Sequence, residues 1–491
     1  MARLCIILGA LLAATPVFAK TIRVPADSST IQAAIDSADK GDVVLVAAGT
    51  YRERITLRSD VTLKSVGDDS KGKSGLARAE ATVIDAAIKG EEPNNAKNGK
   101  PGVSMASGSV LDGFTITGVG QYDDELWKKH QATQGNEQPH EHIGAAGTPG
   151  VAIFGVDCEV RNNIVHHIGY TGIAITGVKG RLCSPIVKRN TCYRNMGGGI
   201  GSMKGSTATI RGNTCFENFY AGIGNDGASP LIVDNTCFQN IRAGIGISED
   251  SCSIVRGNRC YKNRRAGIGV RSGSATRPVI EDNDCYQNDM AGIGAEDHAA
   301  PVISKNRCYE NKLAGIGVRE HATRTIIGNE CYRNGTVGIG QESNAATTLI
   351  RNHCHDNLAA GIGFAECENG RSTLIENRVI NNAKVAIGIQ SGWMVTATKN
   401  ELSREGGMPP IVMIFAGAKA NFVQNTIRGE GVAGIRVAGE LTATDNTLTC
   451  AKPQKGGPPS FGVWVLDGAK VRLSGNSFDG WRLDHSESDI P

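Results

Sequence analysis

Charged side chains recur in this sequence at one fixed place, two residues after the end of a repeated Gly-Ile-Gly triplet. They are Asp226, Arg271, Glu296, Arg319 and Glu342. Two carboxylates separated by about 6.5–9.5 Å can catalyse inverting hydrolysis of a glycosidic bond, and guanidinium groups bind carboxylates through paired hydrogen bonds. The alternation of charge is equally typical of a ladder of surface ion pairs, each contributing about 1 kcal/mol or less. The pattern therefore predicts either a binding or catalytic site along one face of the protein or a ladder of solvent-exposed ion pairs.

Histidines are a second group of candidates, because imidazole nitrogens bind Zn²⁺ and Cu²⁺. The candidate metal ligands are His140, His142, His166, His167, His298 and His321. The first two lie in the only long irregular stretch, residues 121–150, and a loop of that length in a regular protein is often functional. The last two fall at matching places in successive repeats, beside Asp297 and Glu320, which suits a metal or acid–base site and also a solvated turn.

The element that must position these residues is a repeat of about 23 residues. Its frame is Asn-x-Cys-aromatic-x-Asn followed by Gly-Ile-Gly, and its cysteines are Cys192, Cys215, Cys237, Cys260, Cys285, Cys308, Cys331 and Cys354. Each repeat contains three short β-compatible runs separated by turn residues. A period of this kind predicts an all-β fold, a single right-handed parallel β-helix of about sixteen three-strand coils stacked at about 4.8 Å.

Two outward columns follow from the alternation of side chains along a strand. The second glycine of each triplet forms a bare column, in which Gly269, Gly294, Gly317 and Gly340 are candidate substrate-binding positions together with Asp226. Repeated glycine weakens a strand, which suggests that a ligand approaches the backbone. The frame aromatics Tyr261, Tyr286 and Tyr309 form the other column. Stacked aromatics can bind sugar rings, or they can simply stack on one another.

The cysteines of the frame are predicted to point inward as small apolar side chains. Eight thiols in a row could hold a soft ion such as Cu(I), but a densely packed core leaves no space for one. Parallel stacking keeps neighbouring Cβ atoms about 4.8 Å apart, beyond the separation of about 3.8 Å that a disulfide prefers. We therefore expect buried free thiols.

The chain ends carry features of their own. Residues 1–19 hold a short apolar run and a small-residue cleavage site, which indicate a signal peptide and a periplasmic or secreted protein. Residues 20–75 are predicted to form the first coil and a capping helix that starts with a capping box at Ser29 and Gln32. The β-helix is predicted over 76–480, most regular at 187–366, with a tail at 481–491. No later stretch suits a membrane span, and a net charge of +3 argues against a nucleic-acid partner.

The opening and the repeats together resemble a known superfamily. The segment TIQAAIDSADKGDVVLVAAGTYRERITL and the repeated Asn-x-hydrophobe-x-x-Asn-x-x-x-Gly-Ile look like the pectin-lyase-like parallel β-helix repeat proteins. These include pectate lyases, polygalacturonases, alginate lyases and epimerases, and the periplasmic β-helix protein of nitrous-oxide-reductase copper maturation. The sequence lacks the Asn-Thr-Asp and Gly-His-Gly pattern of polygalacturonases and the Asp-Pro-His-Asp pattern of alginate epimerases.

This resemblance implies a substrate groove across the sheet that carries the glycine column. It further implies that Arg271 or Arg319 abstracts the proton α to a uronate carboxylate, while Glu296 and Glu342 bind the sugar or Ca²⁺. The functional hypothesis is an extracytoplasmic protein that binds an acidic polysaccharide, with cleavage or epimerisation left open. The alternative is a non-enzymatic periplasmic scaffold or metal (copper) accessory protein. The oligomeric state stays open.

Overall fold

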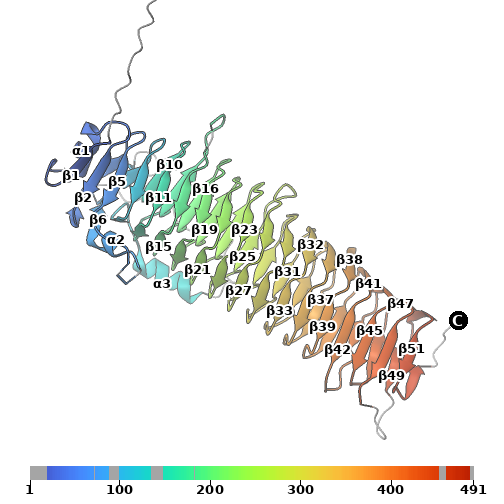
Figure 1. Cartoon of the computed structure of the whole chain (residues 1–491). Helices are drawn as coiled ribbons and strands as arrows, with labels where there is room; N and C mark the ends of the chain where they lie inside the picture. Colours follow the sequence, from blue (N-terminus) through green and yellow to red (C-terminus); the bar gives the residue numbers. More distant parts are fainter. Residues whose placement is uncertain are drawn as a thin grey trace, which may run out of the picture.

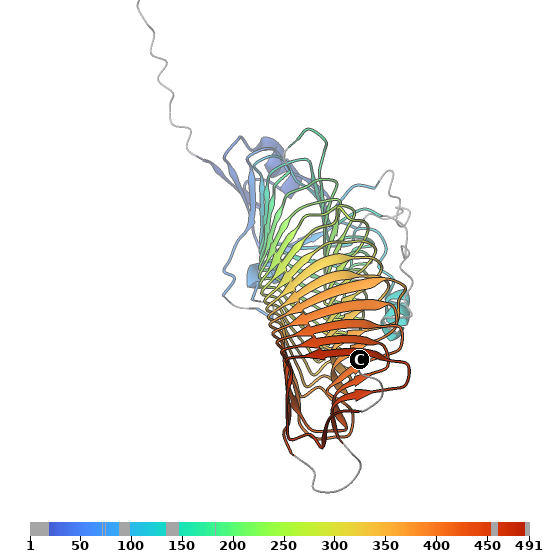
Figure 2. The same cartoon turned by 90° about the vertical axis from the view of Figure 1, so that its right-hand side faces the viewer.

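The computed structural model describes residues 19–70, 72–73, 75–87, 99–133, 147–181, 183–452 and 460–486. The predicted signal peptide, apart from its last residue, and the candidates His140 and His142 lie outside the described residues. The described residues wind into one parallel β-solenoid, a rod whose sheets run along its whole length (Figure 1). Figure 2 shows the strands of successive coils stacked in the same direction along the rod.

The first sheet, sheet A, has 18 strands among the described residues. Its first nine are β1 (Thr21–Val24), β2 (Val43–Val46), β5 (Thr62–Ser65), β8 (Val110–Asp112), β11 (Glu159–Arg161), β14 (Ile186–Lys188), β17 (Thr209–Arg211), β20 (Leu231–Val233) and β23 (Ile254–Arg256). It continues with β26 (Val279–Glu281), β29 (Val302–Ser304), β32 (Thr323–Ile327), β35 (Ala346–Ile350), β38 (Gly370–Ile375), β41 (Trp393–Thr398), β44 (Lys419–Val423), β47 (Glu440–Thr444) and β50 (Lys470–Ser474).

The second sheet, sheet B, holds the strands that contain the frame cysteines. It begins with β3 (Gly49–Tyr51), β6 (Thr82–Asp85), β9 (Thr115–Thr117), β12 (Ile164–His166), β15 (Thr191–Tyr193), β18 (Thr214–Phe216), β21 (Thr236–Phe238) and β24 (Arg259–Tyr261). It continues with β27 (Asp284–Tyr286), β30 (Arg307–Tyr309), β33 (Glu330–Tyr332), β36 (His353–His355), β39 (Arg378–Ile380), β42 (Glu401–Arg404), β45 (Thr426–Gly429), β48 (Thr447–Cys450) and β51 (Ser477–Asp479).

The third sheet, sheet C, holds the Gly-Ile-Gly strands. It begins with β4 (Ile55–Thr56), β7 (Val103–Ser104), β10 (Val151–Phe154), β13 (Ile173–Thr176), β16 (Ile200–Met203), β19 (Ile223–Asp226), β22 (Ile245–Ser248) and β25 (Ile268–Val270). It continues with β28 (Ile293–Ala295), β31 (Ile316–Val318), β34 (Ile339–Gln341), β37 (Ala360–Phe364), β40 (Val385–Ile389), β43 (Val412–Ile414), β46 (Ala433–Val437), β49 (Phe461–Val465) and β52 (Leu483–His485).

The predicted all-β solenoid with three strands per coil is confirmed, and each strand pairs in parallel with its equivalent one coil away, as Cys285 does with Cys308. The predicted number of about sixteen coils is too low, since sheet A alone has 18 strands among the described residues. Coils such as those of β2 and β50 carry neither the frame cysteine nor the Gly-Ile-Gly, so counting the frame misses them. Strand β52 also lies where only a tail was expected.

Isoleucine, cysteine and asparagine fill the interior of the rod. All eight frame cysteines are fully buried, with 0% of their surface exposed, and they are free thiols, as predicted. Buried asparagines form ladders, in which Nδ2 of Asn258 donates to Oδ1 of Asn283 at 3.0 Å. The residue before each of these asparagines has a left-handed backbone, as Asp282 has with φ 54°.

The helices differ in detail from the sequence prediction. Helix α1 (Ile31–Ser37) is capped by Thr30, whose side chain accepts from the backbone N–H of Ala33, so the predicted cap at Ser29 is one residue early. Helix α2 (Ala77–Ala81) is short, and α3 (Asp124–Ala132) lies within the stretch expected to be irregular. Of the helices in the described residues, none is both long and apolar enough to cross a membrane.

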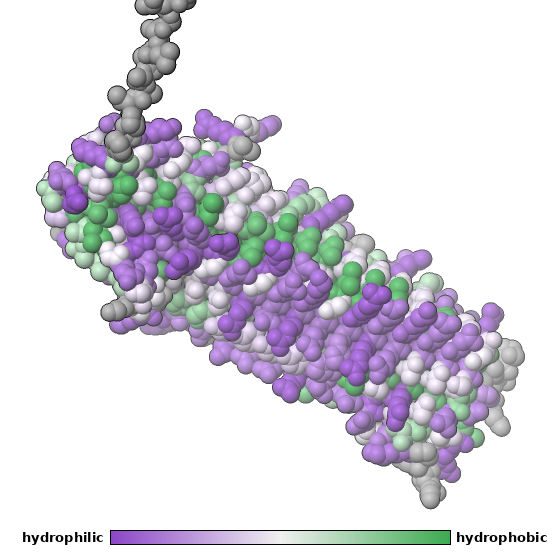
Figure 3. Space-filling view, viewed as in Figure 1, coloured by the Kyte–Doolittle hydropathy of each residue, from purple (hydrophilic) through white to green (hydrophobic). Residues whose placement is uncertain are grey.

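The outer face of sheet A carries apolar side chains at the first position of several short strands. These are Ile186, Ile254, Val279 and Val302, each between 37% and 46% exposed. Figure 3 shows apolar surface along the middle of the rod on the face where β23 and β32 lie in Figure 1, bordered by polar surface. The outer face of sheet A is therefore partly apolar.

Candidate functional site: a groove along the glycine column

A groove of about 710 Å³ runs along the outer face of sheet C. Its floor is the column of second glycines, Gly201, Gly224, Gly246, Gly269, Gly294, Gly317 and Gly340, which we call the glycine lane. A second cavity of about 630 Å³ shares Gly340 and Glu342 with the first and extends the floor over Gly363 and Gly388. The lane thus spans nine coils, or roughly 38 Å at about 4.8 Å per coil. The predicted groove on this sheet is present.

The two glycines of each triplet have different roles. A Cβ on the first, Gly292, would lie 2.7 Å from the carbonyl oxygen of Gly315 and 2.8 Å from Nδ2 of Asn311, so packing requires glycine there. A Cβ on the second, Gly294, would meet only the Cβ of Ala266, at 3.7 Å. Gly294 also lacks the positive φ that would favour glycine. The fold therefore requires the first glycine. It leaves room for a side chain at the second glycine of the central coils, such as Gly294, but not at Gly340, where a Cβ would lie 2.9 Å from Cγ2 of Val337.

One wall of the groove is the predicted charged column, since Asp226, Arg271, Glu296, Arg319 and Glu342 all line it. Nε of Arg319 donates to Oε2 of Glu296 at 2.8 Å. Burial alone would lower the pKa of Arg319, but this hydrogen bond and the negative charge of Glu296 more than offset it and raise the pKa. Arg319 and Glu296 thus form a fixed ion pair at the middle of the wall.

The opposite wall was not predicted from the sequence. It comprises the residues two positions before each triplet, Tyr220, Arg242, Arg265, Met290, Leu313 and Thr336. Burial lowers the pKa of Arg242 to about 10, and burial likewise lowers the pKa of Arg265. The Arg242 guanidinium lies 5.1 Å from the centre of the Tyr220 ring. Constant spacing relative to the triplet was the signal in the sequence that could have identified this wall.

Three arginines give the central part of the groove a positive character. Arg242 precedes β22, while Arg265 and Arg271 flank β25, one coil further along. After burial, the positive charges of Arg265 and Arg271 contribute to the lowered pKa of Arg242. An anionic ligand would relieve this repulsion and stabilise the charged form of each guanidinium. The part of the groove around these arginines is thus better suited to an anion than to a cation.

The aromatic column lies on a different face. Tyr261, Tyr286 and Tyr309 stack on the outside of sheet B, with ring centres 4.9 Å apart and rings within 7° of parallel. Because each ring covers the face of the next, the column presents ring edges rather than free faces to solvent. The structure therefore does not bring these candidate sugar-binding residues together with the glycine lane.

The histidine candidates fall into separate places. His298 and His321 stack with ring centres 5.2 Å apart, and both lie on turns, where their backbones have positive φ. His166 and His167 are adjacent, with their Nδ1 atoms 2.7 Å apart. Since His140 and His142 lie outside the described residues, the metal site predicted from these six histidines stays a prediction.

Part of the predicted irregular insertion forms α3, which packs against the side of the rod (Figure 2). Trp127 is buried against Phe219 and Ile241, and its Nε1 donates to the carbonyl oxygen of Glu217 at 2.8 Å. These contacts place α3 beside the turns that join sheet B to sheet C. The helix borders the groove from outside without lining it.

Comparison with known structures shows similarity to other β-helical proteins. A double mutant of the periplasmic alginate epimerase AlgG aligns over 54% of this chain and 74% of its own, at 16% identity and a TM-score of 0.46. The A-module of the Azotobacter vinelandii mannuronan C-5 epimerase AlgE6 aligns over 91% and 94%, at 16% identity and a TM-score of 0.38.

A GH87 α-1,3-glucanase catalytic unit from Streptomyces thermodiastaticus aligns over 98% of this chain and 72% of its own, at 13% identity and a TM-score of 0.31. Comparison with curated proteins gives no match. The family model described as "right handed beta helix region" matches residues 142–278 and 250–402. These matches together cover more than half of the 491 residues, so the chain belongs to the right-handed β-helix family.

Proposed function

We propose that this protein binds an acidic polysaccharide lengthwise in the groove of sheet C. The observation that carries the proposal is the glycine lane, because the fold tolerates a side chain at Gly294 and yet the sequence keeps the position bare on successive coils. A lane without side chains lets an extended polymer approach the backbone closely. In the central coils, where neither packing nor backbone conformation requires glycine, a binding role explains why the column stays bare.

The charge of the walls supports an anionic polymer. Arg242, Arg265 and Arg271 lie in the central part of the groove, and burial lowers the pKa of the first two. Guanidinium groups bind carboxylates strongly and with defined geometry. A uronate-containing chain presents a carboxylate on its sugar units and matches these donors, whereas a neutral glucan does not.

The arginines give the first test of the proposal. Each hydrogen bond to a charged group contributes about 1.5–3 kcal/mol, so Arg265→Gln and Arg271→Gln should each weaken oligouronate binding by about tenfold or more. Binding should also become less sensitive to salt. The control is Arg351→Gln, which removes an exposed arginine that pairs with Glu376 away from the groove. Equal affinity of the Arg265 variant, the Arg271 variant and wild type for oligouronates, by calorimetry, would contradict the proposal.

The same mixtures of protein and oligouronate show whether the protein modifies the sugar after binding it. Arg319 forms an ion pair with Glu296, and its pKa is raised. Arg319 therefore suits a role as a permanent positive charge that binds an anion better than a role as a base that accepts a proton. Absorbance of an unsaturated product would reveal lyase activity, new reducing ends would reveal hydrolysis, and exchange of solvent deuterium into the sugar would reveal epimerisation. If no uronate polymer binds to the wild type, the scaffold alternative becomes the better one.

We also propose an extracytoplasmic location, which rests on the signal-peptide pattern of residues 1–19. Burial of the eight frame thiols is compatible with an oxidising compartment, since a thiol shielded from solvent is not available for exchange. Fractionation of cells that produce the full chain should recover a protein whose first residue is Lys20. An unprocessed chain in the cytoplasmic fraction would overturn this proposal.

A further inference from the structure

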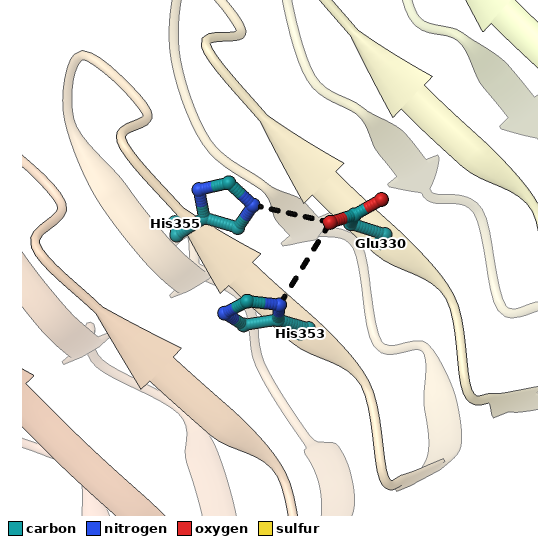
Figure 4. Close-up of side chains that lie close together, drawn as sticks. All are labelled: Glu330, His353 and His355. Carbon is teal, nitrogen blue, oxygen red and sulfur yellow. Dashed lines mark hydrogen bonds and ion pairs between the residues drawn. The ribbon is translucent and has the colours of Figure 1, made fainter.

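A cluster of one glutamate and two histidines lies on the outer face of sheet B, away from the groove. His353 and His355 belong to the same strand, β36, and flank the inward-pointing Cys354. Glu330 is on the neighbouring strand β33, directly opposite His353 in the register. Figure 4 shows both imidazoles directed at the Glu330 carboxylate. The strand alternation places all three side chains on one surface.

The distances suit a bound metal ion. Oε1 of Glu330 lies 3.5 Å from Nε2 of His355 and 3.9 Å from Nδ1 of His353, and one ligand atom from each residue falls within 4.8 Å of the others. In a tetrahedral Zn²⁺ site with bonds of about 2.0–2.1 Å, ligand atoms are about 3.3 Å apart. Small rotations of partly exposed side chains would bring the three atoms to that spacing.

A second layer of contacts orients His355. Its Nδ1 lies 2.8 Å from Oδ2 of Asp356, so an Nδ1–H donated to this carboxylate leaves the Nε2 lone pair directed at Glu330. Carboxylates hold metal-binding imidazoles in the correct tautomer in this way. The His355 ring also stacks on Tyr332, with centres 5.0 Å apart and planes within 3°. The imidazole is therefore positioned before any ion binds.

Neighbouring cations leave the ligand atoms accessible. Nε of Arg307 lies 3.5 Å from Oε2 of Glu330, which leaves Oε1 for the histidines. Arg378 pairs with Glu401 at 3.2 Å. The side chains of Glu330, His353 and His355 are between 21% and 39% exposed, so solvent reaches the centre of the cluster. A fourth position would remain open to water.

We propose that Glu330, His353 and His355 bind one divalent transition-metal ion of the imidazole-preferring class, with Zn²⁺ as the probe. Two nitrogens and one carboxylate oxygen with an open fourth position form the ligand set of a three-ligand zinc site. Cu²⁺ binds such nitrogen ligands more tightly still. The site is independent of the groove, because its side chains lie on sheet B and the groove lies on sheet C.

The test is Zn²⁺ binding to the tag-free protein, measured by calorimetry and by competition with a chromophoric chelator. The wild type should bind one ion. His353→Ala combined with His355→Ala should weaken that binding at least 100-fold, and Asp356→Asn by about 10- to 100-fold. Both variants should melt like wild type, because these side chains point outward. If the double variant misfolds, Glu330→Gln removes one ligand with little change in shape.

The matched control is His298→Ala combined with His321→Ala, which removes a stacked histidine pair on the turns and should keep the binding. Co²⁺ bound to the wild type should give visible absorption bands of a four-coordinate site, and His353→Ala with His355→Ala should abolish them. A wild type that binds neither Zn²⁺ nor Cu²⁺ overturns the proposal. So does a site that survives His353→Ala with His355→Ala, or one that disappears in the control variant.

Discussion

At the scale of single residues, the two glycines of a Gly-Ile-Gly triplet such as Gly292-Ile293-Gly294 differ in whether the surrounding structure has room for a side chain. Gly292→Ala would force a Cβ to 2.7 Å from a backbone carbonyl oxygen, and overpacking of this kind costs about 1–3 kcal/mol. Gly294→Ala meets its nearest neighbour at 3.7 Å and should leave stability unchanged or raise it by up to about 1 kcal/mol. Thermal melting of the two variants checks the prediction. Equal destabilisation would show that both glycines are structural.

A second residue of interest is Arg324, which is only 3% exposed. Within the described residues its three guanidinium nitrogens have no hydrogen-bond partner, and burial lowers its pKa to about 9. A buried cation without hydrogen-bond partners is costly, and the negative charge of Glu296 offsets burial only in part, since the pKa of Arg324 is still lowered. Arg324→Met should therefore raise the free energy of unfolding by about 1–4 kcal/mol. Chemical unfolding at neutral pH measures the change. A less stable variant would reveal a compensating contact, such as a bound anion.

Sequence reasoning at this scale found one wall of the groove and missed the other. The charged wall was visible because Arg271 and Glu296 keep the same offset after the triplet. Arg242 and Arg265 keep an equally constant offset before it, but the apolar Met290 and Leu313 interrupt the charge along that wall. A column of residues is easily recognised in a sequence when its members are chemically alike. The residues of this wall keep a constant position in the repeat, but their side-chain type changes from coil to coil.

At the scale of elements, α3 is the largest departure from the repeat. Its anchor is Trp127, which packs on Phe219 and Ile241, while the Arg194 guanidinium lies 4.9 Å from the indole centre. Removing a buried tryptophan side chain costs about 3–5 kcal/mol of stabilisation. A helix of nine residues is only marginally stable without tertiary contacts and cannot offset that loss. Trp127→Ala should therefore detach α3 and leave the coils folded.

Hydrogen exchange gives the measurement for this element. In Trp127→Ala the amides of 124–132 should lose protection, while those of β27 and β30 keep it. Glu125→Ala is the matched control, because its side chain is 87% exposed and pairs with Lys128 of the same helix. Protection of α3 that persists in Trp127→Ala would mean that other contacts hold the helix, such as the 2.7 Å hydrogen bond from Arg264 to the Thr133 carbonyl oxygen.

The sequence predicted elements well where the repeat is strict and less well outside it. The cysteine column predicted β27 and the glycine column predicted β28, because each position carries the same residue type in successive repeats. Helix α3 lacks that repetition, and its strongest sequence signal is local: Asp123 caps it by accepting from the backbone N–H of Leu126. The cap at Thr30 instead of Ser29 shows that neighbouring hydroxyl residues cannot be ranked from sequence alone.

At the scale of the whole molecule, one repeat produces three unlike outer faces. Sheet A presents apolar side chains such as Ile254 and Val279. Sheet B presents stacked rings and, at β33 and β36, the glutamate and histidines of the proposed metal site. Sheet C presents the bare lane between charged walls. The repeat fixes the inward residues for packing, and the outward columns are free to differ in function.

The central claim is that the groove of sheet C binds a polymer on the glycine lane, and calorimetry of oligouronate binding to Gly294→Leu combined with Gly317→Leu tests it most directly. Leucine at these positions would point into the groove and leave the inward core intact. The control is Thr325→Leu combined with Thr348→Leu, which adds the same side chains outside sheet A, where the two positions are neighbours in the register and face outward.

Exposed substitutions away from special backbone geometry seldom cost more than about 0.5 kcal/mol, so both double variants should melt close to wild type. The lane variant should lose oligouronate binding, and the control should retain it. Wild-type affinity in the lane variant would contradict the account and would exclude the glycine lane as the binding surface.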